Sequence, residues 1–310
     1  MLKSDTIKTS YTARLIPNIS KINNNHRREH CLANRREINM IGRNQGQQVR
    51  IERTTANGTR MLALYTVIDV HDQDRDAVFV GYTNSEDLWD RLELSSTEPF
   101  TGKVNAQVAA ANLSDADAEA NSEFIEHLTD DGHHCGLVVI APHGGDIEKP
   151  TDEQAEVVGK QLSSKYVSKW TCKGFKQGGG AYDRWHITST DISEESFPKL
   201  KKIIGRHFEY SIAFHGWDHD SIFIGGSIPS DLKQQIKTAI GNVVSGSGIV
   251  VAKDDDGSCP DDFNGTDPKN IVNRLSAKGV QIEQSREARA RYGIKIAKAV
   301  ADVIGPMIKG

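Results

Sequence analysis

Two histidines and one glutamate stand where catalytic zinc ligands are expected. His143 follows the apolar run 136–142, Glu148 lies shortly after it, and His215 follows a second apolar run at 210–214. Imidazole nitrogens and carboxylate oxygens bind zinc at about 2.0–2.2 Å, and a set of three protein ligands leaves the fourth position open. We therefore expect one zinc ion (Zn2+) per chain, bound by His143, Glu148 and His215.

The glycines between His143 and Glu148 favour this interpretation. Gly144 and Gly145 allow a sharp backbone turn, which would swing Glu148 back towards the His143 ring. Taken alone, this motif also fits an ordinary loop in which Glu148 caps the following helix. His215 favours the metal site, because a strand followed by His-Gly occurs twice in the chain.

Glu283 is the candidate catalytic general base. It lies near the end of a mostly apolar strand at 279–285, where an unpaired carboxylate would be costly to bury. Burial raises the pKa of a carboxyl group, which suits a base that takes a proton from zinc-activated water. The alternative is an ion pair between Glu283 and Arg274 or Arg286.

Three further residues are candidates for substrate binding, namely Asn273, Arg274 and Arg286. The planar guanidinium group matches a carboxylate in bidentate geometry. We expect these residues to bind an acidic group of the substrate. The alternative is that both arginines are ordinary charges on a helix surface.

These residues require a scaffold that brings separate strands to one edge. Beyond about residue 113, strand-like and helix-like runs alternate, which predicts an α/β domain with an open mixed, largely parallel sheet flanked by helices. Sites in such sheets lie beyond the carboxyl ends of the strands. The expected strands are 136–142, 183–190, 210–216, 221–226, 248–253 and 279–285, and the expected helices are 114–128, 151–166, 193–208, 230–244, 268–276 and 285–304.

The chain before residue 113 differs in composition. Residues 1–45 are polar and locally basic, and we expect a solvated arm. The alternative is an arm that binds a polyanion or a neighbouring subunit. Residues 46–112 predict a small β-rich N-terminal domain with a hairpin at Asn57-Gly58. Three parts are therefore expected: the arm at 1–45, the β-rich domain at 46–112 and a zinc hydrolase domain at 113–310.

Composition excludes several classes of partner. The 310 residues carry a formal net charge of −4, so no nucleic-acid partner is expected. No segment predicts a signal peptide or a membrane span, and we expect a cytoplasmic protein. The four cysteines form no C-x-x-C pair, which argues against a thiolate zinc site and a disulfide framework. The sequence gives no indication of the oligomeric state.

The motifs together resemble the poly-γ-glutamate hydrolases, phage and bacterial zinc peptidases related in fold to the carboxypeptidases. The resemblance rests on Ala141–Gly145 with Glu148, Phe214–Gly216, Asn270–Arg274 and Gly279–Glu283, and it extends over roughly residues 113–308. It implies a carboxypeptidase-like sheet, one zinc ion and hydrolysis of γ-glutamyl amide bonds in an anionic polyamide. By position, His143, Glu148 and His215 would bind the metal, and Glu283 would be the catalytic glutamate. A phage-derived protein is a further implication.

Two other interpretations account for part of the sequence. The run Pro142–Glu148 is similar to the signature of zinc de-N-acetylases, which would need an aspartate at 145 or 146 and His219 or His215 as a later ligand. That assignment leaves Glu283 and Arg274 without roles. A non-catalytic phage or host binding module with a decayed site is the other alternative, and the intact candidate residues argue against it.

Overall fold

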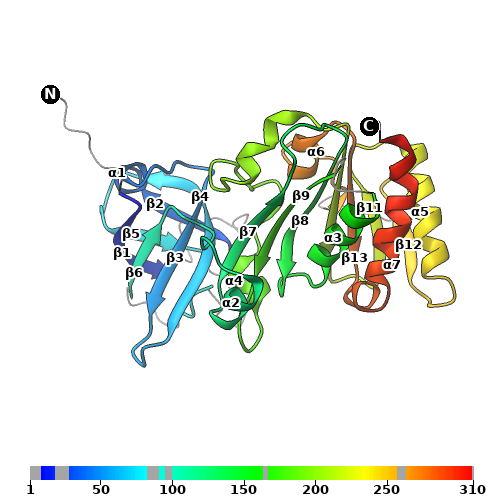
Figure 1. Ribbon diagram of the computed structural model, residues 1–310. Coiled ribbons are helices and arrows are strands. Elements are labelled where there is room, and N and C mark those ends of the chain that lie inside the picture. The colour runs from blue at the N-terminus through cyan, green and yellow to red at the C-terminus, as the bar shows by residue number, and fades with distance from the viewer. Residues whose placement is uncertain are drawn as a thin grey trace. The chain divides into compact units, whose positions relative to one another are not determined.

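The computed structural model describes residues 8–17, 28–81, 91–94, 100–162, 167–256 and 263–308. The chain forms two compact units (Figure 1). Unit 1 contains Met1–Ser114 and Asp183–Phe197, and unit 2 contains Asp115–Tyr182 and Pro198–Gly310. Unit 1 is therefore built from two separate stretches of sequence.

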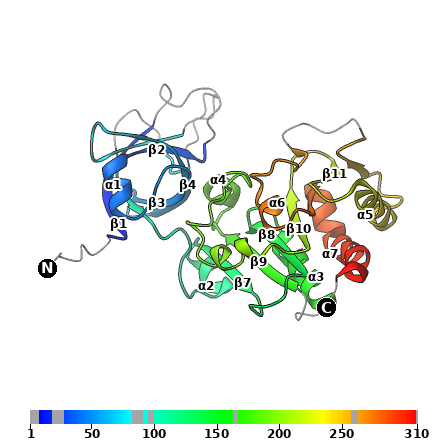
Figure 2. The ribbon, with the colours of Figure 1, turned by 90° about the horizontal axis from the view of Figure 1, so that it is seen from above.

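The described strands of unit 1 form a closed barrel, whose ring of strands is visible in Figure 2. The strand order is β1-β5-β2-β4-β3-β6. Alternate side chains point inwards, and the interior includes Leu15, Val49, Ile51 and Tyr65. The elements are β1 (Ser10–Pro17), β2 (His30–Asn34), α1 (Arg35–Met40), β3 (Gln48–Thr54), β4 (Arg60–His71), β5 (Ala77–Val80) and β6 (Phe100–Asn105).

The barrel corrects one expectation and confirms another. The prediction of a solvated arm over residues 1–45 is wrong for its described residues, because β1 and β2 are barrel strands. Ala13 and Leu15 are buried on either side of Arg14, so the segment is polar overall and still has an apolar face. Residues 1–7 and 18–27 of this segment lie outside the described residues. The hairpin is confirmed, since β3 and β4 pair antiparallel around Gly58, which has a φ of 84°.

Unit 2 is organised around a seven-stranded sheet of order β12-β11-β13-β10-β8-β9-β7. The pairs β12/β11, β13/β10, β10/β8 and β8/β9 are parallel. The pairs β11/β13 and β9/β7 are antiparallel, so the predicted mixed, largely parallel sheet is confirmed. The strands are β7 (Phe124–Thr129), β8 (Leu137–Gly145), β9 (Val167–Gly174), β10 (Tyr210–Gly216), β11 (Ser221–Gly225), β12 (Val250–Lys253) and β13 (Gly279–Gln284).

Three long helices cover one face of this sheet (Figure 1). They are α3 (Thr151–Gln161), α5 (Ser230–Val243) and α7 (Arg286–Ile304). Their apolar residues, among them Val158, Ile236 and Ile296, share one core with the strands. None of the helices in the described ranges is long and apolar enough to cross a membrane. The shorter elements are α2 (Asp115–Ala120), α4 (Ala181–Trp185), α6 (Ile271–Leu275) and the 3₁₀ turns η1 (Leu200–Lys202), η2 (Ile204–Arg206) and η4 (Gly305–Met307).

Three predicted elements of the second half are wrong. The helix expected over 114–128 ends at Ala120, because Ser122 has a positive φ of 53° and β7 begins at Phe124. The helix expected over 193–208 is replaced by η1 and η2, since Pro198 interrupts any helix at that point. The strand expected over 183–190 is the end of α4 followed by turns.

Candidate metal centre

The sheet directs His215 and Glu283 to the face opposite the three long helices. The neighbouring residues Ile212, Phe214, Val280 and Ile282 belong to the core beneath those helices. Because successive side chains of a strand point to opposite faces, His215 and Glu283 point to the other face. They are also paired across β10 and β13, which are parallel neighbours, so their side chains lie beside each other.

An irregularity in β8 brings His143 to the same face. Leu137, Val139 and Ala141 all belong to the helix-facing core, so regular alternation would direct residue 143 to the helices as well. The register between β8 and β9 shifts between Ala141 and Gly144, where β8 has one extra residue. Such a β-bulge reverses the face of the sheet to which the following side chains point. The His143 side chain consequently points towards His215 instead of into the core beneath the helices.

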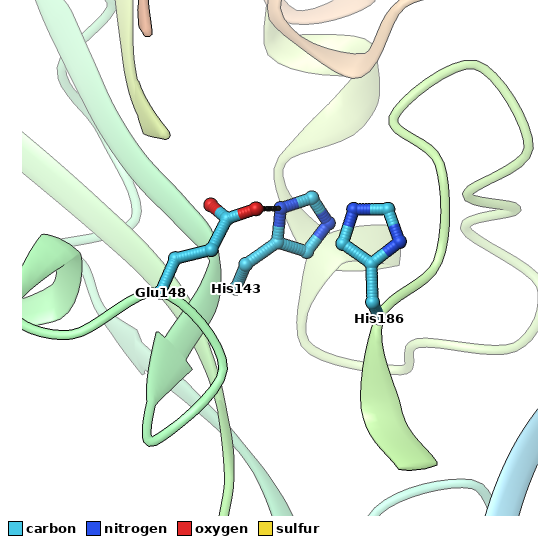
Figure 3. A group of neighbouring side chains, drawn as sticks. All are labelled: His143, Glu148 and His186. Carbon is cyan, nitrogen blue, oxygen red and sulfur yellow. Dashed lines mark ion pairs between the residues drawn. The ribbon is translucent and has the colours of Figure 1, made fainter. Parts of the chain in front are cut away.

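Three potential ligand atoms converge at this point. Nδ1 of His143 lies 3.1 Å from Nδ1 of His215 and 3.2 Å from Oε1 of Glu148. Figure 3 shows the Glu148 carboxylate turned towards His143. Oε2 of Glu148 lies 3.6 Å from Nδ1 of His215. Ligand atoms about 2.1 Å from a tetrahedral zinc ion are about 3.4 Å apart, so the spacing fits a single ion.

The Gly144-Gly145 turn positions Glu148. The Glu148 amide donates to the His143 carbonyl at 2.9 Å, which folds the loop back onto its strand. A Cβ atom on Gly144 would lie 2.6 Å from Cβ of Asp152, and Gly145 has a φ of 66°, so both positions require glycine. Gly216 completes the arrangement, because its amide donates to Oε2 of Glu148 at 2.8 Å.

The two glutamates of the centre have opposite pKa shifts. Burial opposes ionisation of Glu148, but the charges and hydrogen bonds of His143 and His215 hold its pKa well below the ordinary value. Burial and the nearby charge of Glu148 raise the pKa of Glu283 well above its ordinary value. Glu148 therefore has the character of an anionic ligand. Glu283 has the character of a carboxyl group that holds a proton more readily than an ordinary glutamate does.

A chain of buried amides orients Glu283. Gln281 donates from Nε2 to Oε1 of Glu283 at 2.8 Å. Asn270 donates from Nδ2 to Oε1 of Gln281 at 2.7 Å and also caps α6, where its Oδ1 accepts from the Val272 amide. Neither Gln281 nor Asn270 was predicted from the sequence as a residue of this site. The available signal was the position of Gln281, two residues before Glu283 and hence on the same face of the strand.

A cavity of about 640 Å³ opens beside the centre. Glu148, Gly216, Trp217 and the glycines 178–180 contribute to its lining. The predicted Arg286 lines it as well, together with Arg289, which the sequence analysis did not single out. The signal for Arg289 was its spacing of three residues from Arg286 at the start of a helix, which places both on one side.

The other predicted residues lie elsewhere. Asn273 lies against Gly279 at the amino end of β13, where its side chain donates to the carbonyls of Gly265 and Asp267. Arg274 is its neighbour in α6, and neither lines the cavity. His219 is exposed and stacks on Trp217, with ring centroids 4.7 Å apart. It is not among the converging atoms, as a de-N-acetylase arrangement built on it would require.

Most of unit 2 is similar in sequence to a family of known proteins. Residues 111–298 match the model of the poly-gamma-glutamate hydrolase family. This match covers more than half of the chain, and the chain belongs to that family. The resemblance inferred from the motifs is thereby confirmed.

Two curated relatives come from Bacillus subtilis (strain 168). UPF0714 protein YndL is 32% identical over 172 residues, which are 53% of this chain and 60% of YndL. The SPbeta prophage-derived UPF0714 protein YoqZ is 28% identical over 156 residues, 49% of this chain and 50% of YoqZ. The chain thus spans between half and three fifths of the length of these relatives. A solved structure of a bacteriophage poly-gamma-glutamate hydrolase aligns with 59% of this chain and 89% of its own, with 23% identity and a TM-score of 0.46.

Proposed function

We propose that this protein is a zinc-dependent hydrolase that cleaves γ-glutamyl amide bonds in poly-γ-glutamate or a related anionic polyamide. The observation that carries the proposal is the convergence of two imidazole nitrogens and one carboxylate within 3.1 to 3.6 Å, beside an open cavity. Membership of the poly-gamma-glutamate hydrolase family supports the substrate class. The prophage origin of one relative fits a phage-related role.

The donor set supports zinc as the metal. His143, Glu148 and His215 offer two imidazoles and one carboxylate, which is a ligand combination of catalytic zinc sites with an open fourth position. Zinc bound there would polarise an amide carbonyl and lower the pKa of a water molecule. The Gly216 amide would keep the Glu148 carboxylate oriented through its hydrogen bond to Oε2.

Glu283 is the proposed general base. It would take a proton from the water that attacks the carbonyl carbon, and then pass that proton to the amine nitrogen as the carbon–nitrogen bond breaks. Gln281 donates to Oε1, so Oε2 is the oxygen that would carry the proton. The raised pKa of Glu283, caused by burial and by the charge of Glu148, favours this double role.

Incubation of the purified full chain with poly-γ-glutamate tests this function. We expect the average polymer length to fall, as measured by light scattering after size-exclusion chromatography. Glu283→Gln should retain the bound metal and lower kcat about 10²- to 10⁴-fold, the usual contribution of general acid–base catalysis. Glu287→Gln is the matched control, because Glu287 is exposed and pairs with Arg291 on α7. Unchanged polymer in a sample with stoichiometric zinc would refute the proposal.

A further inference from the structure

We propose that Arg289 is a carboxylate receptor that selects γ-linked over α-linked glutamyl chains. This inference rests on the proposed function, because it assigns the specificity of the same site. The sequence analysis had placed substrate recognition on Arg274, Asn273 and Arg286. The structure places a different arginine next to the converging ligand atoms.

Arg289 is held rigidly by backbone acceptors. Its side chain belongs to the buried group, with 8% of the residue exposed. Nε donates to the Lys149 carbonyl at 3.0 Å, and Nη1 donates to the Gln284 carbonyl at 2.6 Å. Within the described residues, no acceptor is found for Nη2. The guanidinium group is therefore fixed in orientation, with one nitrogen available in the cavity that Arg289 lines.

The position of Arg289 is defined by Gly216. A Cβ atom on Gly216 would lie 1.6 Å from Nη1 of Arg289, so the guanidinium group packs directly against the glycine backbone. Gly216 follows His215 in sequence and donates to Glu148. The guanidinium group thus lies one residue from a proposed metal ligand, within reach of a substrate whose scissile bond is at the centre.

The charge of Arg289 is not matched by an ion pair. Among the described residues, no carboxylate oxygen lies within 4.0 Å of its guanidinium nitrogens, although the charges of Glu148, Glu283 and Asp218 act on it. A buried cation without a direct partner is costly. The N-terminal turn of α7 and the exposed Arg286 add positive potential at the same place. An anionic substrate group in the cavity would offset this cost.

The chemistry of the γ-linkage supplies such an anion at the required place. In a γ-linked glutamyl chain, a free α-carboxylate is attached to the carbon that bears the scissile nitrogen. In an α-linked chain that position carries an amide, and the free carboxylate lies at the end of the side chain. A fixed guanidinium close to the metal ligands can donate from Nη2 to the carboxylate of the first arrangement, whereas the second arrangement places no carboxylate there.

A binding experiment isolates this recognition from catalysis. Titration calorimetry would use γ-linked tetraglutamate, its analogue with neutral α-carboxamides, and α-linked tetraglutamate with an amidated C-terminus, which has no α-carboxylate on a carbon that bears an amide nitrogen. The parent protein would be Glu283→Gln, so that no ligand is hydrolysed, and zinc content would be matched between samples. We expect the parent to bind γ-linked tetraglutamate about 10- to 100-fold more tightly than either other peptide, as for a charge-assisted hydrogen-bonded pair.

Arg289→Gln in this background should abolish the preference, and Arg289→Lys should retain part of it. Lys keeps the charge and most of the packing but loses the planar fork, so it also controls for misfolding. Arg291→Gln is the matched control, because Arg291 is exposed on the same helix and pairs with Glu287. Arg291→Gln should prefer γ-linked tetraglutamate over the other two peptides by the same factor as the parent protein does.

Three outcomes overturn the inference: a preference that survives Arg289→Gln, a parent without a preference, or no measurable binding of γ-linked tetraglutamate. Cleavage of poly-γ-glutamate by the wild type alongside any of these would leave the proposed function standing. If the preference for γ-linked tetraglutamate depends on Arg289 but the wild type leaves poly-γ-glutamate intact, the proposed hydrolase activity would be refuted. The role of Arg289 as a carboxylate receptor would be supported.

Discussion

Two clusters of histidine and acidic residues lie at opposite ends of the sheet of unit 2. The carboxyl-edge cluster consists of His143, Glu148, His215 and Glu283. The amino-edge cluster consists of Asp130, Asp131, His134, Ser168 and Arg206, and it lies where β8 and β9 begin and β7 ends. Judged by their residue types alone, both clusters could be metal sites.

The amino-edge cluster is internally satisfied. Nδ1 of His134 lies 2.8 Å from Asp131, and Nε2 of His134 lies 3.2 Å from the Ser168 hydroxyl. Asp130 accepts from Ser168 and forms a two-point ion pair with Arg206. Ser168, His134 and Asp131 even have the connectivity of a catalytic triad, but Ser168 is fully buried. A substrate cannot reach its hydroxyl.

The carboxyl-edge cluster differs in charge balance and access. Its ligand atoms lie within 3.1 to 3.6 Å of one another, and Glu148 lines an open cavity. A cation could be bound by the two imidazole nitrogens and the carboxylate together. The two clusters thus differ in whether their donor atoms converge beside a cavity. We take this convergence, and not the residue types, as the mark of a candidate metal site; the other cluster is a polar network that stabilises the fold.

Removal of one histidine from each cluster should give the largest difference. We expect His215→Ala to lose stoichiometric zinc and to reduce hydrolysis to background, because two ligands cannot hold the ion. His134→Ala should keep zinc and activity. Metal analysis by mass spectrometry and a polymer cleavage assay measure both effects. Equal zinc content in the two variants would remove the distinction between the clusters.

A smaller effect is expected from Gln281→Leu. Loss of the hydrogen bond to Glu283 should lower kcat/KM about tenfold, in line with one lost hydrogen bond to a charged group. The Gln281 amide favours the ionised form of Glu283, so its loss raises the pKa of that carboxyl further. The acidic limb of the pH–rate profile should therefore move to higher pH. Gln234→Leu, on the exposed side of α5, is the control, and an unchanged profile in Gln281→Leu would contradict the positioning role.

The smallest effect concerns stability and the amino-edge cluster. The hydrogen bonds of Asp130 to Arg206 lower its pKa in the folded protein, so the ionised form favours folding. This contribution is complete above the ordinary pKa of about 3.9 and is lost as the pH falls through the folded value. Asp130→Asn should lower the unfolding free energy by about 1–3 kcal/mol at pH 7.

Urea unfolding at pH 7 and at pH 3 measures this difference. We expect the gap between wild type and Asp130→Asn to shrink at pH 3, with zinc content unchanged at pH 7. A gap that is independent of pH would show that the ion pair with Arg206 is not its origin.

The sequence predicted the sheet of unit 2 and the convergence of His143, Glu148 and His215, because each follows a recognisable buried strand or a Gly-Gly turn. It could not predict the bulge that re-aims His143, since one extra residue leaves no pattern in the composition. Gln281 and Arg289 were missed because their roles depend on contacts across α6, α7 and β10. The barrel strands before residue 46 were not predicted because their few apolar residues lie in a segment that is polar and basic overall.

The discontinuity of unit 1 has a consequence for any shortened form of the protein. Residues 183–197 lie in the sequence between the two stretches of unit 2, but they bind residues of the barrel: Gln48 binds Ser196 and Asp191, and Glu29 binds Thr188. A chain that starts at residue 115 would retain this segment without these hydrogen-bond partners. A smaller catalytic fragment would need a short polar linker in place of the segment. The described barrel strands all precede residue 106, and unit 1 is completed by this later segment.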